Sequence, residues 1–294
     1  MLYTLSEVLN TAQKNKYAVV APDFFNLHFA QILLDCVEQN HAPMILSFCD
    51  NKFNTFELDD EVKCIRLVRE LSAAASVPVV FHLDHAPSIE VIHKYLDMGF
   101  TSVMIDASLH PFEENVAITQ KVVELARSYQ ASVEAELGHV GNGRDYLIHD
   151  PSDADLTNVE QVQDFVAQTK VDALAVSIGT QHGFYHASSE LHFDLLERIS
   201  TSTSVPLVLH GSSGTAYEQI KKAVSLGICK LNVFTDLFTV YQQAAEKATP
   251  ANLEEVYKLN EACRSEVYKM FNAFLEISGS IGRASDFPNL PKQN

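Results

Sequence analysis

The sequence predicts an α/β protein built on a parallel β-sheet. Short apolar runs alternate with longer segments of helical periodicity along most of the 294 residues. Nearly continuous apolar runs are typical of parallel strands whose two faces are covered by helices. Eight such repeats favour closure into a (β/α)8 TIM barrel, and a doubly wound open sheet is the alternative architecture.

Eight expected strands set the order of the fold. They cover residues 17–22, 42–48, 77–83, 101–107, 131–137, 173–179, 205–211 and 228–234. Helical patterns fill the segments between them, as at residues 88–99, 111–130 and 216–227. Gly99 and Gly227 are expected to end the first and last of these helices, because glycine readily adopts the left-handed conformation found there.

The two ends of the chain are expected to lie outside these repeats. Residues 1–17 form an amphipathic helical pattern that Thr4 can cap, and they lack the long apolar stretch of a signal peptide. Residues 236–278 predict additional C-terminal helices, and residues 285–294 a loose tail. A hydrophobic content of 47% can fill one large core, so residues 1–294 are expected to form a single barrel domain.

Charge and cysteine content narrow the class of protein. The formal net charge of −17 argues against nucleic acid or an anionic membrane as a partner, because the long-range field repels both. An anionic substrate must therefore be held by local groups. The five cysteines are scattered without a close pair, which indicates the reducing cytoplasm. No segment reaches membrane-spanning length.

Polar residues gather where the expected strands end, which is where a barrel carries its active site. His85, His182 and His210 follow the third, sixth and seventh strands. One such histidine alone is more often structural, but three at equivalent strand ends can converge on one ion and leave coordination positions open, as a catalytic site requires. Neutral imidazoles suit Zn²⁺, and Co²⁺, Fe²⁺ and Mn²⁺ remain compatible.

A glycine-serine turn follows the seventh strand, in the sequence HGSSG at residues 210–214. Its backbone N–H groups and hydroxyls can surround an anion at the start of the next helix. Barrels commonly hold a phosphate between the loops after their seventh and eighth strands. The alternative interpretation is an ordinary strand-to-helix turn in which Ser213 acts as a cap.

Six segments, in this order, resemble class II, metal-dependent ketose-bisphosphate aldolases, especially the tagatose-bisphosphate type: HLDHA, SVMIDAS, SVEAELGHVGN, LAVSIGTQHG, PLVLHGSSG and KLNVFTDL. The resemblance covers residues 17–240. It implies a zinc-dependent TIM barrel that reversibly cleaves a ketose 1-phosphate or ketose 1,6-bisphosphate into dihydroxyacetone phosphate and an aldehyde. It also implies a phosphorylated sugar as substrate, a homodimer or homotetramer, and a monovalent cation (Na⁺ or K⁺) near the phosphate.

The resemblance assigns roles to individual residues. Zinc would be bound by His85, His182 and His210, and Asp84 would exchange the proton of the substrate C4 hydroxyl. Because no Schiff-base lysine is implied, the chemistry needs a Lewis acid and a separate proton shuttle. The dihydroxyacetone phosphate would be held by Gly183, Gly211, Ser213, Asn232 and Thr235, and a distal phosphate by Arg283. Apart from the resemblance, His82 shares the strand parity of Asp84 and is expected to orient the site, and Asp106, Glu134 and Glu136 are candidates to orient the imidazoles. A solvated carboxylate is the alternative for Glu136.

The chain departs from the family around the substrate. Asp23 stands where the family usually has asparagine, and Phe234 where it has a small residue. Arg144 aligns with the loop glutamate that exchanges the C3 proton, which leaves Asp145 as the nearest carboxylate and Tyr146 as a weaker candidate. Asp23 is expected to add negative charge near the substrate, and together these changes predict specialisation away from fructose and tagatose bisphosphates, toward a ketose phosphate whose distal end is not phosphorylated. The alternative is that the loop aligns differently, with Asp145 or Asp150 in the usual role and bisphosphate cleavage intact.

Two other classes of function remain open at the level of sequence. A non-catalytic paralogue could serve as a regulatory or scaffold subunit, although the complete set of three histidines disfavours this alternative. Another barrel metalloenzyme, such as a hydrolase, would be expected to carry His-x-His on its first strand, and that pair is absent from residues 17–22.

Overall fold

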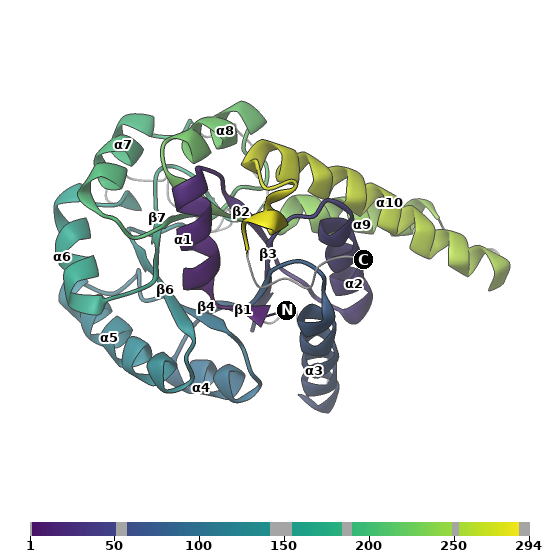
Figure 1. Cartoon of the computed structure of the whole chain (residues 1–294), viewed down its shortest axis with the longest axis horizontal. Helices are drawn as coiled ribbons and strands as arrows, with labels where there is room; N and C mark the ends of the chain where they lie inside the picture. Colours follow the sequence, from purple (N-terminus) through teal and green to yellow (C-terminus); the bar gives the residue numbers. More distant parts are fainter. Residues whose placement is uncertain (1, 51–57, 142–154, 184–189, 249–252, 288–294) are drawn as a thin grey trace.

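The computed structural model describes residues 2–50, 58–141, 155–183, 190–248 and 253–287. Its centre is a curled sheet of parallel strands, each of which falls within or beside an expected strand (Figure 1). The strands are β2 (Val19–Pro22), β3 (Met44–Cys49), β4 (Val79–Ala86), β5 (Ser102–Ile105), β6 (Ser132–Leu137), β7 (Ala173–Val176), β8 (Leu207–Leu209) and β9 (Ile228–Val233).

The sheet curls until its first and last strands meet. Pairing runs without a break from β3 through β9, and β9 pairs in parallel with β2. Between β2 and β3 the described residues form a single parallel bridge, from Asp23 to Ser47. The α/β class and the parallel order are therefore confirmed, while strand pairing does not fully close the ring at this seam.

Helices cover the outer face of the sheet, as the apolar strands predicted (Figure 1). They are α2 (Leu27–Gln39), α3 (Leu58–Ala74), α4 (Ile89–Asp97), α5 (Phe112–Ser128), α6 (Val159–Thr169), α7 (Phe193–Ser202) and α8 (Tyr217–Ser225). Helix α4 illustrates the pattern: Ser88 caps its first turn, and Ile92 and Leu96 are buried against the strands. Gly99 and Gly227 have φ values of 85° and 118°, which confirms their expected place beyond helix ends.

The N-terminal residues of the chain cover the amino ends of the strands. Thr4 and Glu7 form a capping box at the start of α1 (Leu5–Asn15), which confirms the expected cap. In Figure 1 this helix lies across the middle of the ring of strands. Its buried side chains, among them Leu5 and Leu9, join a cluster with inward residues of the strands such as Val80. Beside it, β1 (Leu2–Tyr3) pairs with the first residues of β4.

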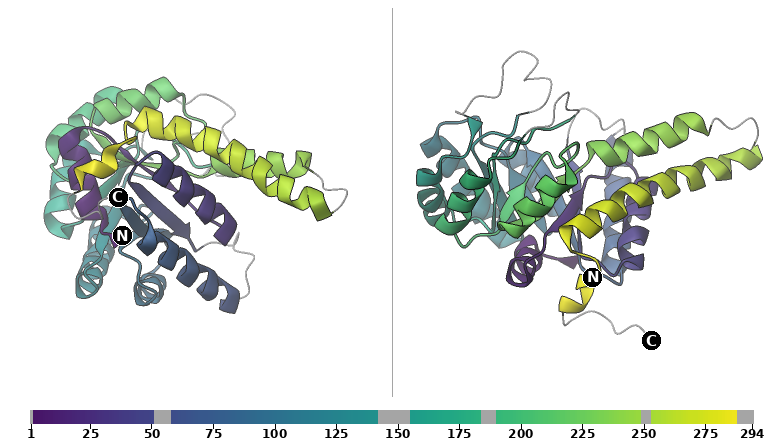
Figure 2. Two further views of the ribbon diagram at one scale, coloured as in Figure 1. Left: turned by 45° about the vertical axis from the view of Figure 1, so that its right-hand side comes forward. Right: turned by 90° about the horizontal axis from the view of Figure 1, so that it is seen from above.

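Two long helices confirm the expected C-terminal addition. Helices α9 (Thr235–Lys247) and α10 (Leu253–Ser278) run side by side and project as an arm from the curled sheet (Figure 2). The expectation of a loose tail from residue 285 is wrong at its start, because η3 (Arg283–Asp286) is ordered and Phe287 packs against Tyr3 with ring centroids 5.4 Å apart. In the described segments, no helix combines the length and apolar character that a membrane crossing requires.

The packing of α1 makes a stability prediction. Leu9 is fully buried, so Leu9→Ala should lower the free energy of unfolding by about 2–5 kcal/mol through lost burial and the cavity left behind. Leu67→Ala is the matched control, because Leu67 lies on helix α3 with 48% of its surface exposed and should change stability by about 0.5 kcal/mol or less. Urea unfolding measures both values. Equal losses of unfolding free energy in the two variants would contradict the conclusion that α1 covers the amino ends of the strands.

Candidate metal centre and active site

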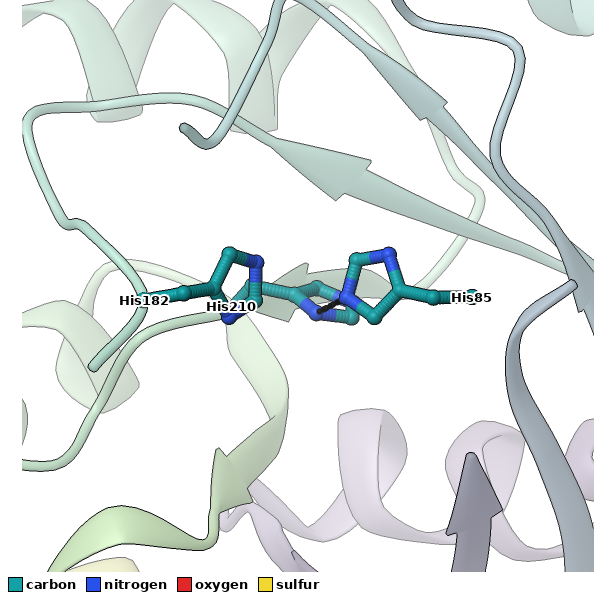
Figure 3. A group of neighbouring side chains, drawn as sticks. All are labelled: His85, His182 and His210. Atoms are coloured by element: carbon teal, nitrogen blue, oxygen red, sulfur yellow. Dashed lines mark hydrogen bonds between the residues drawn. The ribbon is translucent and has the colours of Figure 1, made fainter. Parts of the chain in front are cut away.

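The structure brings together the three histidines that the strand ends predicted. Figure 3 shows His85, His182 and His210 with their rings turned toward one another. Ring centroids lie 4.8 Å apart for His85 and His182, 4.6 Å for His85 and His210, and 5.5 Å for His182 and His210. One nitrogen from each ring falls within 4.8 Å of the others, which is the arrangement of a three-ligand metal site.

An irregularity in β4 allows two neighbouring residues to face this site. Side chains alternate between the faces of a regular strand, so the inward position of Asp84 would turn His85 outward. The register of β4 against β5 shifts between Leu83 and Ala86, and His85 adopts a φ of 45°. That left-handed conformation is uncommon outside glycine and is typical of functional positions. It lets Asp84 and His85 act in one site.

Carboxylates fix the orientation of two of the rings. Asp106 lies 3.0 Å from Nδ1 of His85, and Glu134 lies 2.9 Å from Nε2 of His210. An ionised carboxylate only accepts hydrogen bonds, so these two nitrogens donate and the opposite nitrogens are the ones that could bind a metal ion. Those opposite nitrogens, Nε2 of His85 and Nδ1 of His210, are 2.9 Å apart.

The donor set fits a cation. Nε2 of His182 is buried and has no hydrogen-bond partner among the described residues, which is costly unless something binds it. Carboxyl groups also outnumber the fixed cations here, since Lys230 is the only fully buried lysine or arginine in the described parts of the chain. The acidic side chains around the histidines are Asp23, Asp84, Asp106, Glu134 and Glu136. A divalent ion would satisfy the orphan nitrogen and balance this charge.

These contacts displace several pKa values in the protein without metal. Burial alone would lower the pKa of His85, but the Asp84 and Asp106 carboxylates raise it to about 10. Burial alone would raise the pKa of Glu134, but Lys230 and His210 lower it to about 2. Lys230 and His210 therefore hold the Glu134 carboxylate in its ionised form.

Asp84 is held at the edge of the histidine cluster by residues from two strands. Nδ2 of Asn232 lies 3.1 Å from each oxygen of Asp84, and Nε2 of His82 lies 3.5 Å from one of them. Burial raises the pKa of Asp84, but His85, His82 and Lys230 outweigh burial and hold it well below its ordinary value. Asp84 is therefore an oriented, ionised carboxylate.

Two other carboxyl groups differ from Asp84. Burial, with the neighbouring Asp84 carboxylate, raises the pKa of Asp23 well above its ordinary value. Burial therefore opposes the negative charge that the sequence predicts at Asp23. Burial and Asp106 raise the pKa of Glu136 to about 8, and Oε2 of Glu136 is buried without a described partner. Glu136 is fully buried, so the alternative of a solvated carboxylate is wrong.

The glycine-serine turn is built around positive φ angles. Gly211 and Gly214 have φ values of 65° and 77°, which a side chain would strain, and they turn the chain directly after His210. Oγ of Ser213 accepts a hydrogen bond from the N–H of Asp236 at 3.2 Å, and Asp236 in turn accepts from the N–H of Gly214 at 3.1 Å. Ser213 thus caps α9, not the helix after its own turn, and its O–H remains able to donate.

Of the remaining predicted site residues, Gly183 and Thr235 belong to the described structure and Asp145 does not. Gly183 follows His182 directly, and Thr235 opens α9 beside Asn232. Asp145 lies outside the described residues, as do Arg144 and Tyr146.

The prediction for Arg283 is not supported within this chain. Its guanidinium lies 5.1 Å from the ring centroid of Tyr17, at the amino end of β2, and the next residue donates to the carbonyl of His41, just before β3. Arg283 is therefore at the opposite end of the sheet from the histidines. Lys230, by contrast, lies in the site and was missed, although a lysine inside the apolar run ICKLNV, two residues before Asn232, signals an inward polar position.

A curled parallel α/β sheet with three converging imidazoles beside an ionised aspartate defines a metal-dependent enzyme. Residues 3–283 match the family model of class II fructose-bisphosphate aldolases, and the chain belongs to this metal-dependent family. It is an aldolase, a carbon-carbon lyase of carbohydrate metabolism, whose reaction yields dihydroxyacetone phosphate and an aldehyde. The non-catalytic alternative is thereby set aside.

Two relatives share 42% of their aligned residues with this chain. One is the D-tagatose-1,6-bisphosphate aldolase subunit GatY of Klebsiella oxytoca, aligned over 237 residues that cover 81% of this chain and 82% of the relative. The other is a probable fructose-bisphosphate aldolase of Bacillus subtilis (strain 168), aligned over 241 residues that cover 80% of this chain and 82% of the relative.

Crystal structures of related proteins have the same architecture. The YdjI aldolase from Escherichia coli K12 superposes with a TM-score of 0.84 at 32% identity, over 97% of this chain and 100% of the other. A putative fructose-1,6-bisphosphate aldolase from Coccidioides immitis gives a TM-score of 0.84 at 26% identity, over 96% and 98% of the two chains.

The histidine cluster predicts the metal content of the purified protein. We expect one divalent ion per chain, lost on chelation together with activity, and we expect His182→Ala to lower the bound metal severely because it removes a ligand. His93→Ala should retain the metal, since that side chain is 53% exposed on helix α4. Elemental analysis measures the content. Metal-free protein with chelator-resistant activity would contradict the assignment.

Proposed function

We propose that the protein is a zinc-dependent aldolase, folded as a (β/α)8 barrel, that cleaves a ketose 1-phosphate reversibly between C3 and C4. The observation that carries this proposal is the pairing of an orphaned, buried His182 nitrogen within the histidine cluster and an ionised Asp84 beside it. When bound to His85, His182 and His210, the metal supplies a Lewis acid that polarises the substrate carbonyl and stabilises the negative charge developed on cleavage.

Asp84 acts as the general base of cleavage. It takes the proton of the C4 hydroxyl, and it returns that proton to the aldehyde oxygen in the condensation direction. The amide of Asn232 supports this role, because it holds both carboxylate oxygens at 3.1 Å and restricts their rotation. Oδ1 of Asn232 is buried without a described partner, which suits an acceptor for a substrate hydroxyl.

The phosphate of the substrate binds at the turn after β8. Backbone N–H groups around Gly211 and the hydroxyl of Ser213 provide donors, with Gly183 and Thr235 on the neighbouring loops. A monovalent cation (Na⁺ or K⁺) beside the phosphate completes this binding site. Asp145 exchanges the C3 proton in this scheme, by its place in the sequence next to the aligned loop position.

The distal end of the substrate is not phosphorylated. Among the described lysines and arginines, only Lys230 is within ion-pair distance of the site carboxylates, and it is bonded to Glu134 at 2.7 Å. Phe234 belongs to an aromatic cluster with Phe25 and Phe238, at centroid distances of 6.5 Å and 5.5 Å. Phe234 directly precedes Thr235, so this cluster narrows the site beside the phosphate turn and supports a smaller substrate.

The cellular setting follows the same reasoning. All five cysteines are free, which supports a reducing cytoplasm as the place of action. The resemblance to oligomeric aldolases supports a homodimer or homotetramer, and the net charge of −17 leaves a phosphorylated sugar, not nucleic acid or membrane, as the ligand.

The phosphate site is tested by Ser213→Ala. This change should weaken binding of dihydroxyacetone phosphate by about 1–3 kcal/mol, the scale for one hydrogen bond to a charged group. Ser212→Ala is the matched control, because the buried Ser212 hydroxyl already donates its hydrogen bond to the carbonyl of Leu209 at 3.3 Å. Titration calorimetry measures both. Parent-like affinity in Ser213→Ala would remove Ser213 from the site.

The substrate class is tested by steady-state cleavage. The kcat/KM for a ketose 1-phosphate should exceed that for fructose or tagatose 1,6-bisphosphate, because the only described lysine or arginine at the site carboxylates, Lys230, is already paired and a second phosphate would lack a counter-ion. The Phe234→Ala variant should narrow the difference by widening the site. Bisphosphate cleavage by the parent at about 10⁴ M⁻¹s⁻¹ or faster would defeat this specificity while leaving the aldolase assignment intact.

A further inference from the structure

A layer of buried polar side chains lies inside the curled sheet, next to the histidine cluster. It consists of His82 on β4, Ser102 on β5, Glu134 on β6 and Lys230 on β9, and each has no exposed surface. The corresponding inward positions of a parallel barrel are usually bulky and apolar. A buried lysine and glutamate cost free energy through desolvation unless they are paired, so their presence calls for a function.

Glu134 connects this polar layer to the histidine cluster. Its Oε2 is 2.7 Å from Nζ of Lys230, and its Oε1 is 2.9 Å from Nε2 of His210. The carboxylate is thus held from both sides, and one oxygen is committed to each partner. The contact with Lys230 is short and charge-assisted, which makes it the stronger anchor of Glu134.

The position of Glu134 decides which nitrogen His210 offers to the cluster. An ionised carboxylate accepts a hydrogen bond, so Nε2 of His210 carries the proton and Nδ1 carries the lone pair. Nδ1 lies 2.9 Å from Nε2 of His85, on the side that faces the cluster. With the proton on Nδ1 instead, an N–H would point at the ion and exclude it.

Lys230 has no better alternative partner in the described structure. Its next contacts are Nε2 of His82 at 3.2 Å and Oδ1 of Asp84 at 3.8 Å. His82 is itself fixed by Ser102, whose hydroxyl lies 2.9 Å from Nδ1. Lys230 lies on β9 two residues before Asn232, so one strand orients both Glu134 and Asp84.

We propose that Lys230 is a positioning residue that holds Glu134 so that His210 presents Nδ1 to the catalytic metal. Lys230 acts on His210 through Glu134, its nearest partner at 2.7 Å, and its longer contact with Asp84 at 3.8 Å is separate from this role. The inference rests on the proposed metal site and assigns to that site a residue that the resemblance does not.

The test compares metal binding and the His210 tautomer in Lys230→Met, which keeps the length of the side chain and removes its charge. Zn²⁺ affinity, measured by chelator competition at one fixed pH, should fall roughly 10- to 100-fold, as is typical when a partner that orients a metal ligand is lost. In the metal-free protein, side-chain ¹⁵N shifts should show His210 as the Nε2–H tautomer in the parent and as a mixture in the variant. Lys63→Met, at a side chain that is 71% exposed, should match the parent in both measurements.

A second pair of variants separates positioning from folding. In a Glu134→Gln background Lys230 has lost its ion pair with residue 134, so adding Lys230→Met should change Zn²⁺ affinity less than about 3-fold, well below the loss expected in the parent background. This comparison decides the matter if Lys230→Met alone does not fold. A loss of 10-fold or more in that background, or parent-like affinity and tautomer in a folded Lys230→Met, would overturn the proposal. A parent protein that binds no Zn²⁺ would overturn the proposed function first.

Discussion

The active site depends on how negative charge is balanced inside the sheet. Strands β4, β5 and β6 direct Asp84, Asp106 and Glu134 inward, and none of these carboxylates can be desolvated without a cationic or donor partner. Lys230 pairs with Glu134, and the imidazoles of His85 and His210 pair with Asp106 and Glu134. These contacts orient the carboxylates and two of the rings, and they leave the buried Nε2 of His182 without a hydrogen-bond partner among the described residues.

Much of this architecture could be predicted from residue order. Apolar runs such as 77–83 have no helical period, so they predict strands, and Gly99 and Gly227 mark helix ends by a backbone conformation that other residues resist. The convergence of His85, His182 and His210 followed from one geometric rule, because the carboxyl ends of parallel strands meet on one side of the sheet.

The residues that were missed depend on contacts between distant strands. Lys230 was passed over because a lysine in an apolar run has no local partner, and Glu134 lies almost a hundred residues earlier. Arg283 lies away from the histidines of its own chain, because the C-terminal turn packs against the start of β2. Sequence periodicity does not predict that packing. The β4 irregularity at His85 was not predicted either, because the adjacent polar residues Asp84 and His85 break the strand alternation without showing how the backbone brings both to one site.

The pairing of β2 with β9 has a consequence for protein synthesis. The chain leaves the ribosome from its amino end, and domains fold as units once their parts are present. A nascent chain that stops before β9 already contains all three histidines, but it lacks Lys230 and Asn232. It also lacks β9 itself, the strand that pairs with β2 at the start of the ring. The three histidines are therefore synthesised before the contacts that arrange them can form. The metal can be captured in its final geometry only after the last strand has emerged.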